Sequence, residues 1–321
     1  MTLPTYLGSL GQTNPYVSVD TVFGFEPTSA SPNRLVDQTL FAVQFLRLKG
    51  GKLVRFLPAL GDPWPNAAEI DFTALVPSIT ATDPYSVQPL GAGSRSREYT
   101  LAEIGGTWQL ANIEADEFSD QRNQVADQTA GKQRAVRTRF GQLFIGGNAA
   151  IAGQFDGLIQ LIAQGYGQSF AASLTNPLDE LRKMVGLLFS NDRDRREIVF
   201  LMNTDALNVI ESLIGLKSDP EQAYRECPLL GGALNLYQCG CPILISDHIE
   251  TDTQTGLTTI FAFNRKQLLG LAGEKNFDIT TVKVESPTLT AHNFLTSWRV
   301  CIASLTGLGL VSCTNFPAVV A

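Results

Sequence analysis

Proline is concentrated in the first hundred of the 321 residues. Ten of the sixteen prolines lie there, at Pro4, Pro15, Pro27, Pro32, Pro58, Pro63, Pro65, Pro77, Pro84 and Pro89. Proline fixes φ and has no amide donor, so it interrupts helices and central strands. We therefore expect the first third of the chain to form only short regular elements, and the remainder to form ordinary packed structure.

Residues 1–33 combine few charges with several aromatic side chains. The only charged residues before Asn33 are Asp20 and Glu26. The aromatic residues of this segment are Tyr6, Tyr16, Phe23 and Phe25. A freely solvated tail is usually rich in charge and poor in aromatic residues. The composition favours an N-terminal arm that lies on another surface; the alternative is an ordinary segment that packs on its own domain.

A long extended loop is expected over residues 50–115. The regular elements predicted in this part are a short helix over 34–49, which leads into the loop, and strands over 52–57 and 97–113. Gly105 and Gly106 are expected to interrupt the second strand. Between the strands, the stretch that begins at Pro58 and ends at Ser94 holds five further prolines and no helical pattern. Loops longer than about 12–15 residues are uncommon in compact domains unless they are functional, so we expect an extended hairpin supported by a neighbouring molecule.

The longest helical pattern covers residues 118–144. Its apolar stripe, at helical spacing, is formed by Val125, Thr129, Val136, Phe140 and Leu143. Acidic residues precede basic ones along this segment, an order that complements the helix dipole. We predict one long helix here, with Gly131 in its interior at a cost of about 1 kcal/mol relative to alanine.

The chain after residue 150 has the alternating pattern of an α+β protein. Asn176 and Pro177 predict the start of a helix that ends at Phe189, and Asn203 or Thr204 caps a second helix that ends at Gly215. Strands are predicted over 198–202, 234–245, 257–263, 277–284 and 295–305, followed by a last apolar piece after Gly309. The chain shows no internal repeat.

Composition excludes several classes of protein. The net charge is −7, and no cluster of Lys and Arg predicts a dedicated nucleic-acid binder. No apolar run reaches the length of about 18 residues needed to cross a bilayer. The five cysteines are sparse and odd in number, which does not suit a disulfide scaffold and indicates reduced thiols in a cytoplasm.

Histidine and cysteine offer two candidate sites. His248 follows Asp247, but neighbours on a strand point to opposite faces, so we expect a structural or surface histidine. Cys239 and Cys241 could bind zinc together with Cys227 and His248. Zinc sites usually use pairs spaced Cys-x-x-Cys, which are absent here, so we expect buried thiols. Disulfides between subunits are a further hypothesis for Cys227, Cys239, Cys241, Cys301 and Cys313.

No motif predicts catalysis or cofactor binding. Gly91-Ala92-Gly93 lacks the third glycine and the helix of a dinucleotide loop, and Gly131-Lys132 lacks the upstream glycine of a phosphate-binding loop. No nucleophile elbow and no His-Glu-x-x-His pattern occurs. We assign no catalytic, cofactor-binding or metal-binding residue, expect no cofactor, and do not expect an enzyme.

Three segments resemble the major capsid proteins of tailed bacteriophages, which have the Hong Kong 97-type fold. FGQLFIGGNAAIAGQFDGL, residues 140–158, is similar to that family's link between its long helix and the next domain, with Phe155, Asp156, Gly157 and Leu158 as its signature. IVFLMNTDALNVI, residues 198–210, resembles a strand that ends in Met-Asn and enters a capped helix. In the third segment, residues 232–249, an apolar strand turns into CPILISDHI, which resembles that family's strand before a late hairpin. The order of these segments, together with the arm and the extended hairpin upstream, extends the resemblance over nearly the whole chain.

The resemblance implies a division of the chain. The parts would be an N-terminal arm (1–33), a short helix (34–49), an extended loop (50–115), a spine helix with peripheral domain (116–150), an axial domain (151–255) and peripheral-domain return strands with the C-terminus (256–321). It also implies a head shell protein of the Caudoviricetes, made in the host cytoplasm, that assembles into pentamers and hexamers of an icosahedral virion shell. The shell would enclose DNA without sequence-specific binding.

The implied partners are copies of the chain, a portal protein and, in some shells, a decoration protein. A separate scaffolding protein is expected, because no long helical segment precedes the arm. We identify no Lys–Asn pair for covalent crosslinking. Two alternatives stay open: an encapsulin-like compartment, and an α+β enzyme or binding protein with a lid over residues 58–95.

Overall fold

The structure is a computed structural model. It describes residues 19–21, 38–49, 52–56, 79–81, 85–87, 97–99, 101–111, 121–173, 176–189, 197–215, 224–227, 229, 233–273, 278–284, 291–305 and 308–318. In these parts of the chain no helix is both long and apolar enough to cross a membrane.

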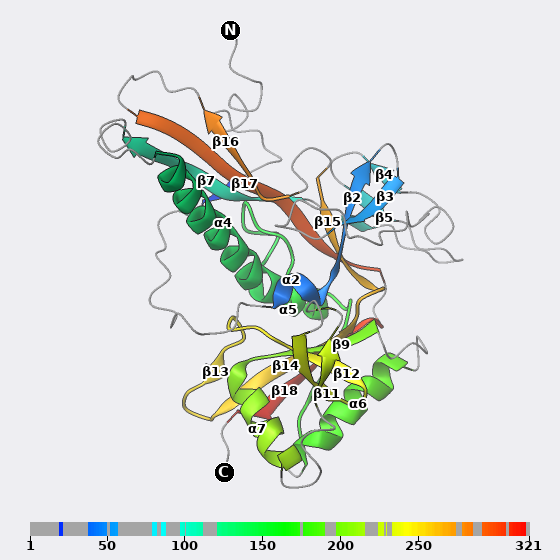
Figure 1. Ribbon diagram of the computed structural model, residues 1–321. Coiled ribbons are helices and arrows are strands. Elements are labelled where there is room, and N and C mark those ends of the chain that lie inside the picture. Colours follow the sequence, from blue (N-terminus) through cyan, green and yellow to red (C-terminus); the bar gives the residue numbers. More distant parts are fainter. Residues whose placement is uncertain are drawn as a thin grey trace.

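A seven-stranded sheet forms one half of the molecule (Figure 1). Its order is β1-β7-β17-β15-β2-β3, with β16 also paired to β17. The strands are β1 (Val19–Thr21), β2 (Gln44–Lys49), β3 (Lys52–Phe56), β7 (Ala102–Ala111), β15 (Leu268–Ala272), β16 (Thr280–Val284) and β17 (Ala291–Ser304). The long β17 organises this sheet, because it pairs antiparallel with β7 on one side and with β16 and β15 on the other.

An eight-stranded sheet forms the other half. Its order is β10-β11-β12-β9-β14-β18-β8, with β13 paired to β14. The strands are β8 (Gln168–Ala171), β9 (Ile198–Met202), β10 (Tyr224–Cys227), β11 (Ala233–Gln238), β12 (Cys241–Ile245), β13 (Thr251–Asp252), β14 (Leu257–Asn264) and β18 (Leu310–Pro317). A separate three-stranded sheet consists of β4 (Ile79–Ala81), β5 (Tyr85–Val87) and β6 (Arg97–Tyr99).

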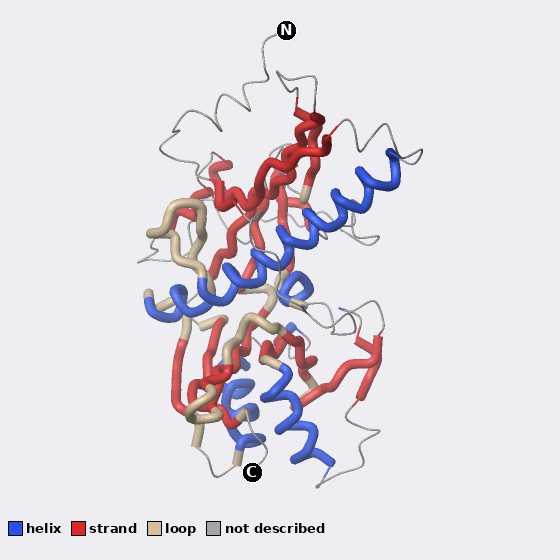
Figure 2. The backbone as a smooth tube through the Cα atoms, turned by 90° about the vertical axis from the view of Figure 1, so that its left-hand side faces the viewer, coloured by secondary structure: helices blue, strands red, loops and turns tan. Residues whose placement is uncertain are grey.

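Helices cover both sheets. The helices are α2 (Thr39–Ala42), α4 (Gln121–Gly146), α5 (Leu158–Ala163), α6 (Pro177–Phe189) and α7 (Thr204–Gly215). Figures 1 and 2 show α4 crossing the molecule obliquely along the seven-stranded sheet, with α2 and α5 near its C-terminal end between the two halves. Figure 1 shows α6 and α7 on the eight-stranded sheet.

The central strand β9 explains how the two halves share a core. All five of its residues are buried. Ile198, Phe200 and Met202 pack into a cluster with α6 and α7. Val199 and Leu201 pack into a second cluster with α4, α5 and the seven-stranded sheet. Side chains alternate along a strand, so β9 joins two cores and is apolar at every position.

Elements with strong local signals are confirmed. The long helix is α4, and its stripe residues Val136, Phe140 and Leu143 are buried. The predicted boundaries of α6, α7 and β9 agree with the structure, and Asn203 is the cap of α7, since its Oδ1 accepts the Ala206 amide at 2.9 Å. The strands predicted over 257–263 and 295–305 are β14 and β17.

The helix predicted over 34–49 is wrong over most of its described part. Only Thr39–Ala42 is helical, and Gln44–Lys49 is strand β2. β2 lies between β15 and β3 in the sheet, and these tertiary pairings override the local pattern. Residues 34–37 lie outside the described part of the chain.

Gly105 and Gly106 do not interrupt their strand. β7 continues through both and pairs with Thr296 and Ser297 of β17. A Cβ on Gly105 would lie 2.2 Å from the Thr296 carbonyl oxygen and 2.7 Å from the Ser297 Cα. Gly105 is therefore required by the close approach of two backbones, not by a break in the strand.

The strand predicted over 234–245 is a hairpin. β11 and β12 pair as Gln238↔Cys241, which leaves Cys239 and Gly240 as a two-residue turn. Both have positive φ, 54° and 81°, as a type I′ hairpin turn requires. Cys239 therefore lies in the turn and Cys241 begins β12, so the two thiols do not belong to one continuous strand.

Part of the arm and extended loop lies within the described residues. The strand predicted over 52–57 is β3, and the strand predicted over 97–113 is found as β6 and β7. The stretch predicted to lack helix contributes β4 and β5. In the arm, β1 pairs with β7 of its own chain, so these three residues follow the alternative prediction of packing on the same domain. The rest of the arm and the excursion lie outside the described residues.

Candidate functional site at the junction of the two sheets

The link from α4 to α5 is built on two glycines that no other residue can replace without movement. A Cβ on Gly147 would lie 2.4 Å from the Phe155 carbonyl oxygen. A Cβ on Gly157 would lie 2.5 Å from the Leu143 carbonyl oxygen. The two glycines also bond to each other, since the Gly157 amide donates to the Gly147 carbonyl at 2.9 Å. The turn between the helices is thus closed by direct backbone contact.

Side chains within the link fix the rest of the turn. The carboxylate of Asp156 accepts the Ala149 amide at 2.9 Å through Oδ1 and the Gln164 side-chain amide at 3.0 Å through Oδ2. Asn148 accepts the Ala150 amide at 2.9 Å. Asp156 therefore holds the turn and α5 in one arrangement, which gives a physical reason for an aspartate at this position of the sequence.

Aromatic packing ties the link to the seven-stranded sheet. The ring of Phe155 lies 5.8 Å from that of Phe140 on α4. Phe140 lies 4.9 Å from Trp298 of β17 and 5.6 Å from Phe45 of β2. Such tilted pairs add to the stabilisation from burial. The junction is therefore part of a packed aromatic core.

A pocket of about 560 Å³ lies beside this junction. Its lining comes from four segments: Arg139, Gln142, Ile145 and Gly146 of α4; Ile159 of α5; the turn Asp247–Glu250; and Thr259 and Phe261 of β14. Of the lining residues, Ile145, Ile249 and Phe261 are buried, whereas Asp247 and Glu250 are exposed. Because the α4–α5 part of the lining and the part from Asp247 to Phe261 lie far apart in sequence, the sequence offers no local signal for the pocket.

The Asp247–His248 pair lies in a turn after β12, beyond the strand predicted over 234–245. Both residues line the pocket. His248 is half-buried and its own amide lies 3.4 Å from the Ser246 hydroxyl. The pair therefore belongs to one site, although not through the geometry of a strand.

Asn203 is the polar centre of the eight-stranded half. It is buried, caps α7 with its oxygen, and donates from Nδ2 to the Ile249 carbonyl at 3.2 Å and to Thr251 Oγ1 at 2.7 Å. A third contact reaches Thr258 Oγ1 at 3.2 Å. The Met-Asn pattern in the sequence predicted the cap, but the contacts to residues about fifty positions away carried no local signal.

The candidate zinc residues are spread over β10, the hairpin turn, β12 and the later turn. In the described ranges no group of three or more His, Cys, Asp or Glu side chains could hold a metal ion. Cys227 lies near Tyr237, and burial together with this thiol raises the pKa of Tyr237. Cys227 and Cys241 are buried, as predicted.

The five thiols differ in exposure. Cys227, Cys241, Cys301 and Cys313 are buried, and Cys239 at the hairpin tip is half-buried. Burial, reinforced by the nearby Glu180, raises the pKa of Cys313 to about 12. A thiol with such a pKa is neutral near pH 7 and is a poor nucleophile. Among the five, exposure therefore favours Cys239 for the hypothesis of disulfides between subunits.

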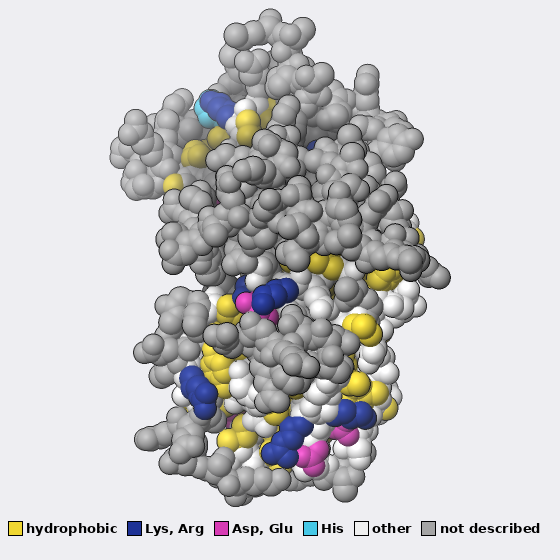
Figure 3. Space-filling view, turned by 90° about the vertical axis from the view of Figure 1, so that its right-hand side faces the viewer, with side chains coloured by type: hydrophobic (Ala, Val, Ile, Leu, Met, Phe, Trp, Pro, Cys, Tyr) yellow, Lys and Arg dark blue, Asp and Glu magenta, His cyan; other side chains and the backbone are white. Residues whose placement is uncertain are grey.

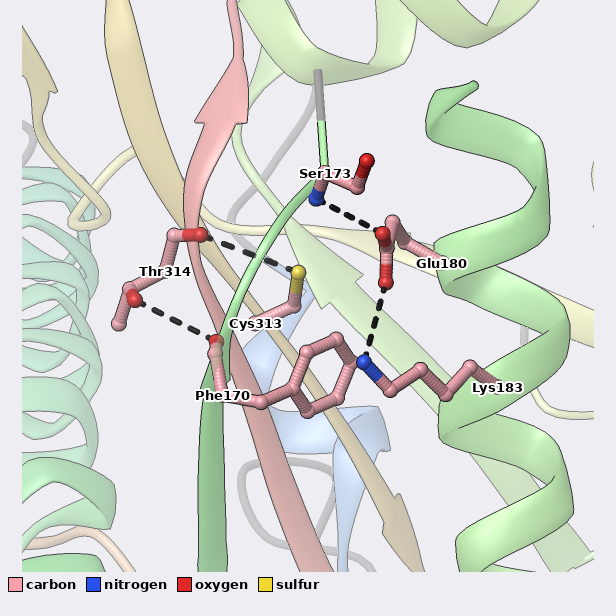
Figure 4. Close-up of polar contacts among 6 residues, drawn as sticks. All are labelled: Phe170, Ser173, Glu180, Lys183, Cys313 and Thr314. Atoms are coloured by element: carbon pink, nitrogen blue, oxygen red, sulfur yellow. Dashed lines mark hydrogen bonds and ion pairs between the residues drawn. The ribbon is translucent and has the colours of Figure 1, made fainter. Parts of the chain in front are cut away.

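A small polar cluster fastens α6 to the edge of the eight-stranded sheet (Figure 4). Buried Glu180 accepts the Ser173 amide at 2.7 Å, and its other oxygen lies 3.7 Å from Lys183 Nζ. Lys183 lies over the Phe170 ring at 3.9 Å, and Thr314 donates to the Phe170 carbonyl at 3.3 Å. The contacts connect α6, β8 and β18, so their effect is to anchor β8.

The remaining candidate motifs carry no site. Lys132 lies within helix α4, and a Cβ on the adjacent Gly131 would meet no atom within 4 Å. Gly91-Ala92-Gly93 lies outside the described residues. On the face drawn in Figure 3, basic side chains lie singly or in small groups among hydrophobic ones, and several lie next to acidic side chains.

Comparison with known proteins identifies the fold. No protein-family model matches the chain, and no curated protein matches it in sequence. A chain of the holo-SrpI encapsulin complex from Synechococcus elongatus PCC 7942 is 18% identical, with a TM-score of 0.55 over 75% of this chain and 85% of that chain. The capsid of the empty GTA particle is 13% identical, with a TM-score of 0.53 over 90% of this chain and 93% of that chain.

The native GTA particle capsid is likewise 13% identical, with a TM-score of 0.53 over 91% of this chain and 95% of that chain. At such identities the likeness concerns the fold. The chain has the Hong Kong 97-type capsid fold, and the α+β architecture expected from the resemblance is confirmed.

Proposed function

We propose that this chain is a shell subunit, the major capsid protein of a tailed phage. The observation that carries the proposal is the likeness to the GTA capsid, which covers 90% of this chain and 93% of that chain. A fold match confined to one sheet would have left the function open, because folds are reused for many activities. Here the matched unit is nearly the entire subunit of a particle.

The division of the chain follows from the same proposal. Residues 1–33 would be the arm, 34–49 the lead-in, 50–115 the extended loop, 116–150 the spine helix with peripheral domain, 151–255 the axial domain and 256–321 the returning strands. Two features support it: β17 and β15 return to the sheet that holds β2 and β7, and α4 enters the eight-stranded half through the Gly147–Gly157 link. Within 256–321, however, β14 and β18 belong to the eight-stranded sheet, so only part of this range returns to the seven-stranded one.

The proposed protein partners are of two kinds. Copies of the chain would form pentamers and hexamers of an icosahedral shell around DNA, with a virion as the location. A portal protein, a scaffolding protein and a decoration protein would act on that shell. The acidic balance of the chain, with a net charge of −7, supports a container that does not bind DNA tightly.

A second candidate is an encapsulin-like compartment, which stores proteins instead of a genome. The TM-score of 0.55 to the SrpI encapsulin complex favours it. The two candidates predict different contents for particles purified from the natural source. Nuclease-protected DNA supports the phage shell, and a stoichiometric second protein without DNA supports the compartment.

Expression of the chain alone tests whether it forms a shell. The subunit has a mass of 34.8 kDa. Sedimentation velocity should show species of at least five subunits, and negative-stain images should show rings or closed shells. A monomer that stays monodisperse at every concentration tested would support the alternative of an enzyme or binding protein with a lid over 58–95.

A further inference from the structure

Two strands that follow each other late in the chain, β17 and β18, occupy inner positions of the two sheets. In the seven-stranded sheet, β17 lies between β7 and β15. In the eight-stranded sheet, β18 lies between β14 and β8. Figure 1 shows them toward the red end of the colour scale, one in each half of the molecule. We call β17 and β18 the closing strands.

The seven-stranded sheet has no continuous path without β17. Among the described strands, β1 and β7 are joined to β15, β2 and β3 only through β17, and β16 pairs with β17 alone. Loss of β17 would therefore leave two separate groups of strands and an isolated β16. A pair of strands is at best marginally stable in water, so β1 and β7 depend on β17 for their place in the fold.

The core between this sheet and α4 is also centred on β17. Trp298 is fully buried, and its ring lies 4.9 Å from Phe140 of α4 and 5.6 Å from Phe45 of β2. Val300 and Ile302 of the same strand are buried in the same cluster. Helices owe most of their stability in proteins to such packing, so α4 has no complete surface to pack on before β17 is in place.

The second closing strand, β18, has the same role in the other half. β8 pairs with β18 alone among the described strands, and α5, α6 and α7 all contact β18. Val311, Cys313 and Phe316 are buried in the core beneath α6 and α7. Leu310 is buried in the core that contains α4. Absence of β18 would therefore open both cores and detach β8.

We propose that the closing strands control folding: both halves stay unfolded until β17 and β18 have been synthesised and inserted. Domains generally fold in order from the N-terminus during synthesis. Here each sheet would have to form around a missing inner strand, so folding waits for the late strands. The inference goes beyond the proposed function and does not depend on it. Its use does, because in a shell subunit the closing strands would keep incomplete chains out of the shell.

Ribosome-bound chains test the closing strands with the whole 321-residue sequence. Translation of an mRNA that ends at codon 321 without a stop codon leaves residues 1–321 attached to the ribosome, with β17 and β18 still in the exit tunnel. A second mRNA adds a flexible Gly/Ser linker after Ala321 that is long enough to bring both strands out of the tunnel. Limited proteolysis reports the folding of each half. Puromycin release of the first chain is the matched control, because the sequence is unchanged.

The chain held at codon 321 should be digested rapidly in both halves. After puromycin release, both halves should be digested at least roughly 100-fold more slowly, because cleavage then requires the opening of a stable fold. The chain with the linker should show the same protection while it is still on the ribosome.

Protection of either half in the chain held at codon 321 would overturn the inference, since that half would have folded without its closing strand. Equally rapid digestion of the held and the released chain would overturn it as well, because the arrival of β17 and β18 would then not complete the fold. Neither outcome bears on the proposed shell function, which is judged by the assembly of the purified protein.

Discussion

Replacement of Gly157 by alanine tests whether backbone contact fixes the junction between the two sheets. The new Cβ would lie 2.5 Å from the Leu143 carbonyl oxygen, 2.7 Å from the Gly147 nitrogen and 2.8 Å from the Ile145 carbonyl oxygen. All three are backbone atoms, so no side-chain rotation can relieve the contacts. Gly157 must move, and it can do so only by weakening its 2.9 Å hydrogen bond to the Gly147 carbonyl.

The magnitude follows from what that movement breaks. A buried amide left without its partner costs about 1–3 kcal/mol. Displacement of the adjoining Phe155 and Leu158, which are 2% and 0% exposed, adds a packing loss of about 1 kcal/mol or more. We expect Gly157→Ala to lower the free energy of unfolding by about 3 kcal/mol.

Urea denaturation of unassembled subunits measures this change, with tryptophan fluorescence as the signal. Trp298 is fully buried and lies 4.9 Å from Phe140, so its emission reports on the junction. Gly131→Ala is the matched control, because a Cβ there meets no atom within 4 Å. It should raise the stability by about 1 kcal/mol. The reasoning would be refuted if the free energy of unfolding of Gly157→Ala lay within about 0.5 kcal/mol of the wild-type value. It would also be refuted if Gly157→Ala and Gly131→Ala changed this free energy in the same direction.

Three further changes test individual contacts. Asn203→Ala removes a helix cap and the three contacts of the side-chain nitrogen, so urea denaturation should show a free energy of unfolding lower by about 2–3 kcal/mol. Asn203→Ser keeps a cap and should lose less stability. Equal losses in the two variants would contradict the role of the cap. Cys239 should be the thiol that reacts first with a disulfide reagent in the native protein. Cys239→Asn, which suits the positive φ of 54°, should abolish this reaction and raise the free energy of unfolding by about 1 kcal/mol. Rapid labelling of a second thiol would contradict the assignment to Cys239. The hydrogen bond to Glu211, followed by burial, raises the pKa of Tyr224 to about 12. Its contribution to stability is therefore complete below the unfolded pKa of about 10 and is lost as the pH rises to about 12. The melting temperature of Tyr224→Phe should fall less than that of the wild type over that pH range. Identical falls in the two proteins would count against the hydrogen bond.

Local signals predicted the elements whose ends are marked by capping residues and whose faces show a clear period. Asn176-Pro177 marks the start of α6, Asn203 marks the start of α7, and the stripe of α4 is buried at Val136 and Phe140. These features depend on residues within one or two turns of each other, so the sequence is sufficient to recognise them.

The failures depend on contacts between distant residues. β2 is a strand because β15, more than two hundred residues later, pairs with it. Gly105 is needed because of Thr296 on β17, not because the strand ends. At the β11–β12 hairpin a local signal did exist, since glycine follows Cys239, but cysteine is an unusual first residue for such a turn.

The candidate site was only partly accessible to sequence reasoning. The Phe155–Leu158 signature was recognised through its resemblance to a family, and the structure supplies the reason for Asp156 and Gly157 in the bonds that close the turn. The pocket could not be foreseen, because four separate segments line it.

Cryo-electron microscopy of the purified, assembled protein tests the shell proposal most directly. The expected result is a ring or closed shell of repeated subunits, each with α4 packed along the seven-stranded sheet and with residues of one copy contacting the next. Fields that contain only separate single subunits, at concentrations where the protein is folded and abundant, would contradict the proposal.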